Sequence, residues 1–503
     1  MKSNDIKNYV GLLLVIALGY FSIAPFFSSG FFPMHDDTQV ARVFTMQKAL
    51  ADGMFPVRWV ADLGYGYGYP IFNFYAPLAY YIGAIFDSLG FDSLTATKIM
   101  MALGVVLSGV SMYLFSRIFF GERVGLLAGL LYMYAPYHAV EIYVRGDVTE
   151  FWAYGFIPLV FWGVYNVYRY KKWTWITIAA FSYAGLILSH NLTAFMVTPF
   201  FFLFALLLFI NARPRMSWKK ALLPGLSLLL GILVATFYWL PTLAEMQYTN
   251  ILSQVAGTVK YQDHFVCLQQ LWDSPWAYGG TAKGCIDGMS FKLGKLHLTL
   301  AGVVIFFVAA SLILGKRIPK VTYFALGGLG FSIFVLFPIS LPLWENIPLM
   351  SFFQYPWRFL IMASFFSAFL GGFVWWGIEK KITGNIFRWA ATLLFAVLII
   401  FINAEVFVPQ KQLNVVSNDY TNREALHWSA SKLTDEYLPA GFDKPKSFAD
   451  IPKEKIQKNK KIIIRDLNEK TQKISFSFSA KEKADLVFNQ AYFPAWQVFI
   501  DGE

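Results

Sequence analysis

The sequence has little charge and almost no cysteine. Only 15% of its 503 residues are charged, whereas an ordinary soluble domain carries about 25%. The two cysteines, Cys267 and Cys285, supply neither a CxxC redox motif nor a thiolate metal cluster. The low charge excludes a water-soluble fold for most of the chain, and the shortage of cysteine excludes zinc-finger and thiol redox chemistry.

Apolar and aromatic residues are abundant instead. Hydrophobic residues make up 57% of the chain, including 51 Phe, 27 Tyr and 16 Trp, which is typical of a surface that meets lipid. The net charge is +11, but the basic residues are scattered between apolar runs and form no patch, so no nucleic-acid partner is predicted. The composition predicts a mainly α, polytopic protein whose first partner is the lipid bilayer.

Eleven apolar runs are long enough to be membrane spans. A helix needs about 20 apolar residues to cross a hydrocarbon core of about 30 Å. The predicted spans are Tyr9–Phe27, Ile99–Ser116, Val124–Val140, Phe151–Tyr168, Trp175–Ser189, Leu192–Ile210, Ala221–Ala244, Leu296–Leu314, Val321–Leu341, Phe359–Gly377 and Phe387–Val408.

Lys and Arg in the short loops predict the orientation. With eleven crossings the basic loops all fall on one face, which is the cytoplasmic face by the positive-inside rule. The N-terminus is then cytoplasmic in a multi-pass protein of the cell membrane, and everything after Pro409 is extracytoplasmic. A further apolar stretch, Ile71–Phe86, would break the alternation if it crossed. We therefore predict that Ile71–Phe86 is a re-entrant or juxtamembrane helix, with its irregular backbone in a protein-lined cavity.

The composition changes abruptly at Pro409, which predicts a transmembrane domain over residues 1–408 and a water-exposed domain over residues 409–503. The later part of the second domain is predicted to be β-rich. Expected strands are Lys460–Leu467, Lys473–Phe478, Ala484–Tyr492 and Gln497–Ile500, the last running into an Asp501-Gly502 turn. That turn lacks a return strand, so we expect the chain to be a truncated version of a longer protein.

Both cysteines share one predicted outer loop, 18 positions apart. An oxidising compartment permits a disulfide there, which would stabilise the fold by about 3 kcal/mol in the loop-entropy model. The alternative is a pair of buried thiols.

Ionisable residues keep to the predicted outer side, which favours an outward-facing active site over an ion pathway. Among them, the run Met34-His35-Asp36-Asp37 directly follows the first span. One of two adjacent carboxylates can ligate a divalent cation while the other accepts a proton from a nucleophile. Asp36 and Asp37 are therefore candidate catalytic residues and candidate metal ligands. The alternative is that one of them caps a predicted helix, Thr38–Ala51.

A second cluster of charged residues lies in the second predicted outer loop. Arg145 is a candidate for binding phosphate, and Asp147 or Glu150 for binding a metal or the acceptor. The alternative is a solvated loop with an internal ion pair.

Three further residues of the outer set are candidate substrate ligands. Arg358 stands beside aromatic rings where a helix re-enters the membrane and suits an anionic headgroup, unless it only snorkels to the interface. His190 lies at a hinge between two spans, where it contacts substrate or metal or serves as a structural histidine. Arg58 is assigned to substrate binding.

These residues and their positions resemble the GT-C membrane glycosyltransferases. The resemblance rests on the acidic pair Asp36-Asp37 in the first outer loop, the Ala76-Pro77-Leu78 segment after a juxtamembrane helix, and Arg145-Gly146-Asp147 with Glu150 in the second outer loop. The stretch from Phe55-Pro56-Val57-Arg58-Trp59 through Leu78 is similar to a subgroup of membrane proteins labelled as related to 6-pyruvoyl-tetrahydropterin synthase. No soluble fold with a three-histidine zinc site, which the pterin label would require, is expected.

The resemblance implies transfer of a sugar from a polyprenyl-phosphate donor to a lipid, glycan or protein acceptor on the non-cytoplasmic face. Asp36 or Asp37 would be the general base or a metal ligand. Arg145 and Arg358 would hold the donor phosphate, and Asp147 or Glu150 would support a metal, Mg²⁺ or Mn²⁺, or the acceptor. His35-Asp36-Asp37 departs from the Asp-Glu or Asp-x-Asp form of familiar relatives, so metal dependence and the identity of the base stay open.

Two other functions are compatible with these residues. A non-catalytic protein could bind or move a polyprenyl-linked or glycolipid substrate in the same cavity. A secondary transporter would need broken midplane helices and inverted repeats, and the sequence offers no convincing repeat.

Overall fold

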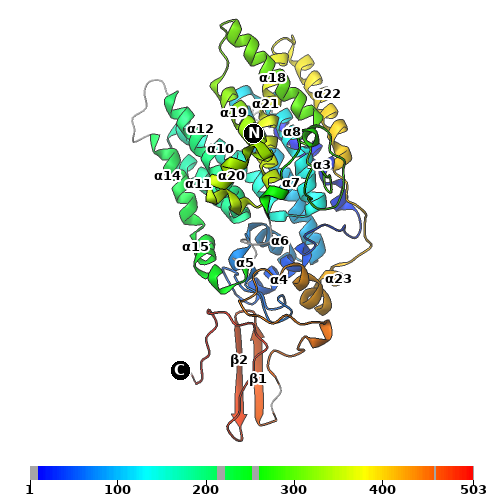
Figure 1. Ribbon diagram of the computed structural model, residues 1–503, viewed down its shortest axis with the longest axis vertical. Coiled ribbons are helices and arrows are strands. Elements are labelled where there is room, and N and C mark those ends of the chain that lie inside the picture. Colours follow the sequence, from blue (N-terminus) through cyan, green and yellow to red (C-terminus); the bar gives the residue numbers. More distant parts are fainter. Residues whose placement is uncertain (1–8, 212–220, 252–259, 458–459, 502–503) are drawn as a thin grey trace. The chain divides into compact units, whose positions relative to one another are not determined.

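The computed structural model describes residues 9–211, 221–251, 260–457 and 460–501, and it is mainly helical (Figure 1). The chain forms two compact units, each built from several separate segments. The first unit comprises residues 1–35, 101–235 and 259–413, and the second comprises residues 36–100, 236–258 and 414–503. The separate water-exposed domain that we expect after Pro409 stays a prediction.

The first unit is a bundle of apolar helices. Helix α21 (Leu360–Glu379) packs against α8 (Glu122–Met133), α18 (Lys295–Ile313) and α19 (Lys320–Leu336), and α11 (Trp173–Ser189) packs against α10 (Val148–Tyr170) and α14 (Leu223–Val234). The other long helices of the unit are α2 (Val10–Leu18), α12 (Asn191–Ile210), α22 (Asn385–Asn403) and the larger part of α7 (Ser93–Phe120). The buried α21 therefore forms the centre of one group of helices in this unit.

Eleven transmembrane helices are not confirmed. Among the described residues, six helices are long and apolar enough to cross a membrane: Val10–Phe27, Ser93–Phe120, Asn191–Ile210, Lys295–Ile313, Pro356–Glu379 and Asn385–Val406. The number reaches eight if two bent pairs each form one span, Leu223–Val234 with Thr236–Tyr248 and Lys320–Leu336 with Pro338–Asn346. The remaining predicted spans correspond to α8 with α9 (Pro136–Val140), to α10 and to the 17-residue α11. The chain is thus a multi-pass membrane protein, with six to eight candidate spans of this length and composition among the described residues.

The predicted span Val124–Val140 is broken for a local reason. Pro136 disfavours helical backbone at Ala135, which is extended, and α9 then restarts with this proline in its first turn. Helix α9 continues into a π-helical turn, η2 (Glu141–Arg145), which ends at Gly146 in the left-handed conformation, with φ of 65°. A side chain at Gly146 would also collide with Met34, since its Cβ would lie 2.1 Å from the Met34 sulfur. Glycine is required where the chain turns from η2 into α10.

Cys267 and Cys285 form a disulfide in the first unit, with their Cα atoms 5.7 Å apart. The disulfide, rather than the alternative of two buried thiols, is therefore correct. It closes the loop that carries the short helix α17 (Leu268–Trp272).

The second unit contains the segment after the acidic pair and the C-terminal part of the chain. Its helices are α4 (Gln39–Ala51), α5 (Ile71–Phe74), α6 (Leu78–Ser88), the first turns of α7, α15 (Thr236–Glu245), α23 (Ser417–Thr421) and α24 (Ser431–Leu433). The stretch Ile71–Phe86 is thus two short helices separated at Tyr75–Pro77, and neither is long enough to be a candidate span. Its re-entrant position in the membrane stays a prediction.

The two predicted strands Lys460–Leu467 and Lys473–Phe478 are confirmed as an antiparallel hairpin of β1 (Ile462–Lys470) and β2 (Lys473–Ala480). Ile462 pairs with Ala480 and Lys470 with Lys473.

The predicted strands Ala484–Tyr492 and Gln497–Ile500 are wrong, because neither stretch forms a strand. Residues in and between these two stretches contact the segment that contains Trp59 and Tyr67 instead of joining a sheet. The Ala491 amide donates to the Tyr67 carbonyl, and the rings of Phe493 and Trp496 contact Trp59. A single hairpin is the only sheet among the described residues, and Gly502 of the predicted turn lies outside them.

Candidate active site

A buried charged cluster lies where η2 turns into α10 in the first unit. Asp147 is the N-cap of α10, and its Oδ1 accepts hydrogen bonds from the Glu150 amide at 3.1 Å and the Thr149 hydroxyl at 2.7 Å. This cap fixes the start of α10 and holds Asp147 and Glu150 on the same turn. The predicted second motif is therefore a structured helix start. The alternative, a solvated loop with an internal ion pair, is wrong about the solvated loop because these residues are buried, but the internal ion pair is present.

Arg145 is shared by three carboxylates. Its guanidinium lies 2.5 Å from Glu141, 2.9 Å from Asp147 and 2.9 Å from Glu150. The same guanidinium lies over the ring of Trp357, 4.7 Å from the ring centroid. With these partners, Arg145 holds the carboxylates in place, and fewer of its donors remain for the phosphate that the sequence assigns to it.

Arg358 is the second cation of the cluster. Its Nε lies 3.4 Å from Glu150 Oε2 and is buried without a hydrogen-bond partner among the described residues. Its Nη1 donates to the Phe353 carbonyl at 3.2 Å. Because no carboxylate encloses Arg358 as Glu141, Asp147 and Glu150 enclose Arg145, Arg358 is the better placed of the two for an added anion.

Burial and neighbouring cations shift the pKa values of two carboxyl groups in the cluster in opposite directions. Burial raises the pKa of Glu141 well above its ordinary value, while Arg145 lowers it less. For Asp147, burial also acts to raise the pKa, but Arg145, His190 and Arg358 outweigh it and the pKa lies well below its ordinary value.

Asp147, Glu150 and His190 form a group that fits a divalent cation. One ligand atom from each of them lies within 4.8 Å of the others. Asp147 Oδ2 and Glu150 Oε1 each accept one hydrogen bond, from Arg145 and from Tyr137, so each retains a lone pair. The His190 Nδ1 faces Thr193, which leaves Nε2 for a ligand. Two carboxylates with one imidazole suit Mn²⁺ better than Mg²⁺, which prefers oxygen ligands.

The acidic pair lies in the second unit. The N-cap of α4 is Thr38, so neither aspartate caps this helix, contrary to the capping alternative. Asp36 and Asp37 are half-buried, and burial raises the pKa of Asp37 to about 6. Asp36 and Asp37 are absent from the ligand group of the first unit. A carboxylate with a pKa of about 6 is matched to accepting a proton near neutral pH.

The residues just before the acidic pair are anchored in the first unit. The His35 amide donates to the Val144 carbonyl at 3.0 Å, and the His35 ring lies 3.0 Å from the Tyr278 carbonyl. His35 is itself exposed. A peptide bond joins His35 to Asp36, so the acidic pair begins one residue after this anchored segment.

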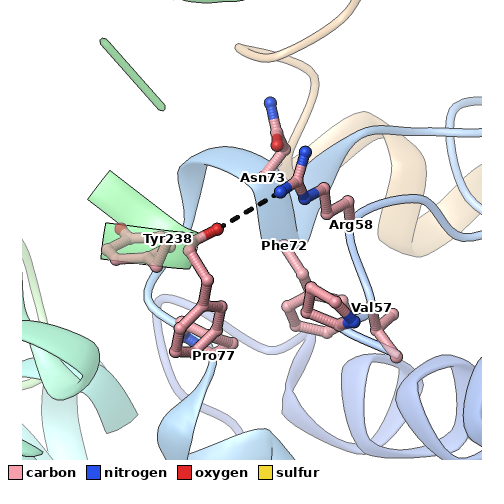
Figure 2. A pocket seen from close by; sticks show the side chains of 8 residues that line it. Val57, Arg58, Phe72, Asn73, Pro77 and Tyr238 are labelled. Atoms are coloured by element: carbon pink, nitrogen blue, oxygen red, sulfur yellow. Dashed lines mark hydrogen bonds between the residues drawn. The ribbon is translucent and has the colours of Figure 1, made fainter. Parts of the chain in front are cut away.

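Arg58 lines a small hollow of the second unit, and neither aspartate of the acidic pair lines it. Figure 2 shows its guanidinium beside Asn73 and above Phe72, with Tyr238 on the opposite wall. Arg58 Nη2 lies 3.5 Å from the Phe237 carbonyl, the dashed line in the figure. The structure thus brings together Arg145, Asp147, Glu150, His190 and Arg358 in one unit, whereas Arg58, Asp36 and Asp37 belong to the other.

Several residues of the charged cluster carry no role in the sequence analysis. Tyr137 donates to Glu150 Oε1 at 2.8 Å, and Trp357 covers Arg145. Glu141 could have been found from its spacing, because a glutamate four residues before an arginine pairs with it on a helical turn. Tyr137 and Trp357 give no such signal, since aromatic residues occur throughout this chain.

Fold and site together define a multi-pass membrane protein with a buried cluster of carboxylates and arginines beside a helix start. The model of the family described as "6-pyruvoyl-tetrahydropterin synthase related domain; membrane protein" matches residues 72–411. The chain belongs to this family. A similar protein, from Lactococcus lactis subsp. cremoris (strain MG1363), is 25% identical over 253 residues, which cover 49% of this chain and 41% of the relative.

Three solved structures are also similar to this chain. The archaeal oligosaccharyltransferase AglB of Archaeoglobus fulgidus has a TM-score of 0.44 and 15% identity, over 80% of this chain and 56% of AglB. ArnT of Cupriavidus metallidurans, bound to undecaprenyl phosphate, has a TM-score of 0.42 and 11% identity, over 80% of this chain and 64% of ArnT. The arabinofuranosyltransferase AftD from Mycobacteria has a TM-score of 0.44 and 12% identity, over 81% of this chain and 28% of AftD.

Proposed function

We propose that this protein is a membrane glycosyltransferase that moves a sugar from a polyprenyl-phosphate donor to a hydroxyl group of a lipid, glycan or protein acceptor, on the non-cytoplasmic face. Asp37 is the general base. Arg358 holds the donor phosphate, and Asp147, Glu150 and His190 form a site for a divalent cation.

The observation that carries the proposal is the half-buried Asp37 with its pKa raised to about 6, in the acidic pair that follows the first span. The buried cluster supports it, because Arg358 is a cation whose Nε has no hydrogen-bond partner among the described residues, beside a group of potential metal ligands. Arg145 orients the carboxylates of that group instead of binding the donor, as its three ion pairs indicate.

In the proposed reaction, the Asp37 carboxylate takes the proton of the acceptor hydroxyl. The acceptor oxygen then forms a bond to the anomeric carbon as the bond from that carbon to the phosphate oxygen breaks. Polyprenyl phosphate leaves with the bonding electron pair, and attack from the opposite side inverts the anomeric centre. Arg358 stabilises the negative charge that develops on the leaving phosphate. A divalent cation bound at Asp147, Glu150 and His190 would supply further positive charge for that phosphate.

Transfer from radiolabelled polyprenyl-phosphate hexoses tests the proposal. The purified protein in lipid is incubated with each donor and a crude cell-envelope acceptor fraction, and released polyprenyl phosphate is measured. Release that depends on both protein and acceptor supports a transferase. Donor binding without turnover in any combination overturns it in favour of a non-catalytic binder of the same lipids.

The pH dependence of transfer should show an acid limb near pH 6. The base must be ionised to accept a proton, and the raised pKa of Asp37 means that it becomes protonated below about 6. We expect kcat/KM to fall about tenfold per pH unit below that value. A limb near pH 4 would contradict Asp37 as the base.

The free energy of unfolding should depend on pH in the opposite direction from activity. The pKa of Asp37 is higher in the folded protein than in the unfolded chain, so protonation of Asp37 stabilises the fold at low pH. This contribution is lost as the pH rises to about 6.

Mn²⁺ should stabilise the protein through the proposed cation site. A ligand present at about a hundred times its Kd stabilises the native state by about 2.7 kcal/mol, which raises the melting temperature measurably. We expect Mn²⁺ to have a larger effect than Mg²⁺ in thermal unfolding, and His190→Ala to abolish the shift. His264→Ala, which removes a half-buried histidine outside the ligand group, is the matched control. An equal shift in His190→Ala would rule out this cation site.

A further inference from the structure

A buried hydrogen-bonded relay ends at the acidic pair of the second unit. Arg42 Nη1 donates to the Tyr80 hydroxyl at 3.1 Å, and the Tyr80 hydroxyl donates to Gln39 Oε1 at 2.6 Å. Gln39 Nε2 then donates to the Asp36 carbonyl at 3.0 Å. Arg42, Tyr80 and Gln39 are 2%, 0% and 1% exposed, so solvent does not compete for the two hydrogen bonds among these three side chains.

The arginine sets the direction of the whole relay. A guanidinium has donors only, so the Tyr80 oxygen must accept from Arg42 and its own hydrogen must go to another acceptor. That acceptor is the oxygen of the Gln39 amide, which turns the amide nitrogen toward Asp36. Without Arg42, the Tyr80 hydroxyl could reverse its direction and donate elsewhere. The Gln39 side-chain amide could then turn its oxygen toward the Asp36 carbonyl oxygen, and the two oxygens would repel each other.

The relay reaches the peptide unit that joins the two aspartates. The Asp36 carbonyl accepts from Gln39 Nε2 and from the Thr38 amide, the latter at 2.7 Å. A peptide unit is planar and includes the Cα atoms of both residues that it joins. Fixing the carbonyl oxygen of Asp36 therefore orients the starting points of both acidic side chains.

The origin of the relay is firmly held. The Arg42 guanidinium lies over the ring of Tyr75, 4.2 Å from the ring centroid, and its charge also interacts with Asp36. Arg42 and Gln39 come from α4, whereas Tyr80 comes from α6, and these two helices pack together. The position of the acidic pair is thus tied to the packing of two helices.

We propose that Arg42, Tyr80 and Gln39 are positioning residues for the acidic pair, acting through the Asp36–Asp37 peptide unit. Their effect on catalysis rests on the proposed function, in which Asp37 is the base. Their effect on the acidic segment does not, and the experiment measures both.

The kinetic test uses transfer from the radiolabelled polyprenyl-phosphate hexose with the highest wild-type activity. Tyr80→Phe should lower kcat at least tenfold with donor KM within twofold of wild type, because a misplaced base slows the chemical step without removing a donor contact. Arg42→Met should lower kcat by a similar factor. Arg42→Lys should keep most of the wild-type kcat, since lysine is also a pure hydrogen-bond donor. The double variant, Tyr80→Phe with Arg42→Met, should have a kcat no lower than that of either single variant. The control is Tyr113→Phe, which removes another buried tyrosine hydroxyl paired with an arginine, Arg117.

Hydrogen–deuterium exchange of the peptide covering Met34–Gln39 supplies the independent readout. Tyr80→Phe and Arg42→Met should raise deuterium uptake there, and Tyr113→Phe and Arg42→Lys should not. Unchanged uptake in Tyr80→Phe overturns the inference, as does a wild-type kcat in that variant. If the wild type transfers no sugar but uptake rises as expected, the proposed function fails while the positioning role stands.

Discussion

An Asp37→Asn variant is expected to lose about a thousandfold of its transfer rate, within the range of 10²–10⁴ that a positioned general base contributes. Asparagine keeps the size of the side chain and its place before α4, but it cannot accept the proton of an acceptor hydroxyl. Because the amide removes the charge that burial disfavours at Asp37, the variant should fold at least as well as the wild type. The measurement is single-turnover release of polyprenyl phosphate.

Asp36→Asn is the matched control for this prediction, since it makes the same chemical change one position earlier. We expect a smaller loss, because the relay holds Asp36 through its main-chain carbonyl, which asparagine retains. A larger loss in Asp36→Asn than in Asp37→Asn would make Asp36 the base. Wild-type rates in both variants would exclude the acidic pair from catalysis.

Arg145→Met is expected to destabilise the protein by about 3–5 kcal/mol, the cost of breaking a buried ion pair by removing one partner. Arg145 faces three carboxylates, and Glu141 and Glu150 are fully buried. Methionine fills similar space but leaves Asp147 and Glu150 with a single cation, Arg358. The expected result is loss of most folded protein, measured by thermal unfolding and by recovery from membranes in detergent.

Lys295→Met provides the comparison. Lys295 pairs with Asp273 at 3.3 Å, and both side chains are more than half exposed. Exposed ion pairs contribute about 0–1 kcal/mol, so this variant should unfold close to the wild-type temperature. Equal stability of the two variants would show that the Arg145 cluster carries no more of the fold than a surface pair does.

Predictions from the sequence are most accurate where the chemistry is local. Asp147, Glu150 and Arg145 are close in the chain, so their grouping follows from their spacing, and the hairpin of β1 and β2 follows from its alternation. His190 and Arg358 join the same cluster from distant helices, and no local pattern reports such a contact. The role of Tyr80 is equally impossible to predict from the sequence, because nothing local distinguishes a tyrosine in a hydrogen-bonded relay from the other 26 tyrosines.

The errors also have physical causes. Apolar length alone predicts a continuous span over Val124–Val140, but Pro136 breaks the helix at Ala135. The turn that carries the charged cluster comes later, at Gly146, where η2 ends. The apolar residues around Phe493 and Trp496 are typical of a strand, yet the rings of Phe493 and Trp496 pack against Trp59. The alternation of apolar and polar residues does not predict such a contact between distant segments.

The disulfide between Cys267 and Cys285 also limits how often the chain crosses the membrane. Such a bond persists in an oxidising compartment, and the topology predicted from the basic loops also puts the loop that carries it outside the cytoplasm. If the N-terminus is cytoplasmic, an odd number of crossings must precede Cys267. The described residues before it contain three candidate spans and one bent pair, which is an even number when the pair crosses once. The parity then requires an odd number of further crossings among α8 with α9, α10 and α11, the helices whose length or composition alone does not qualify them.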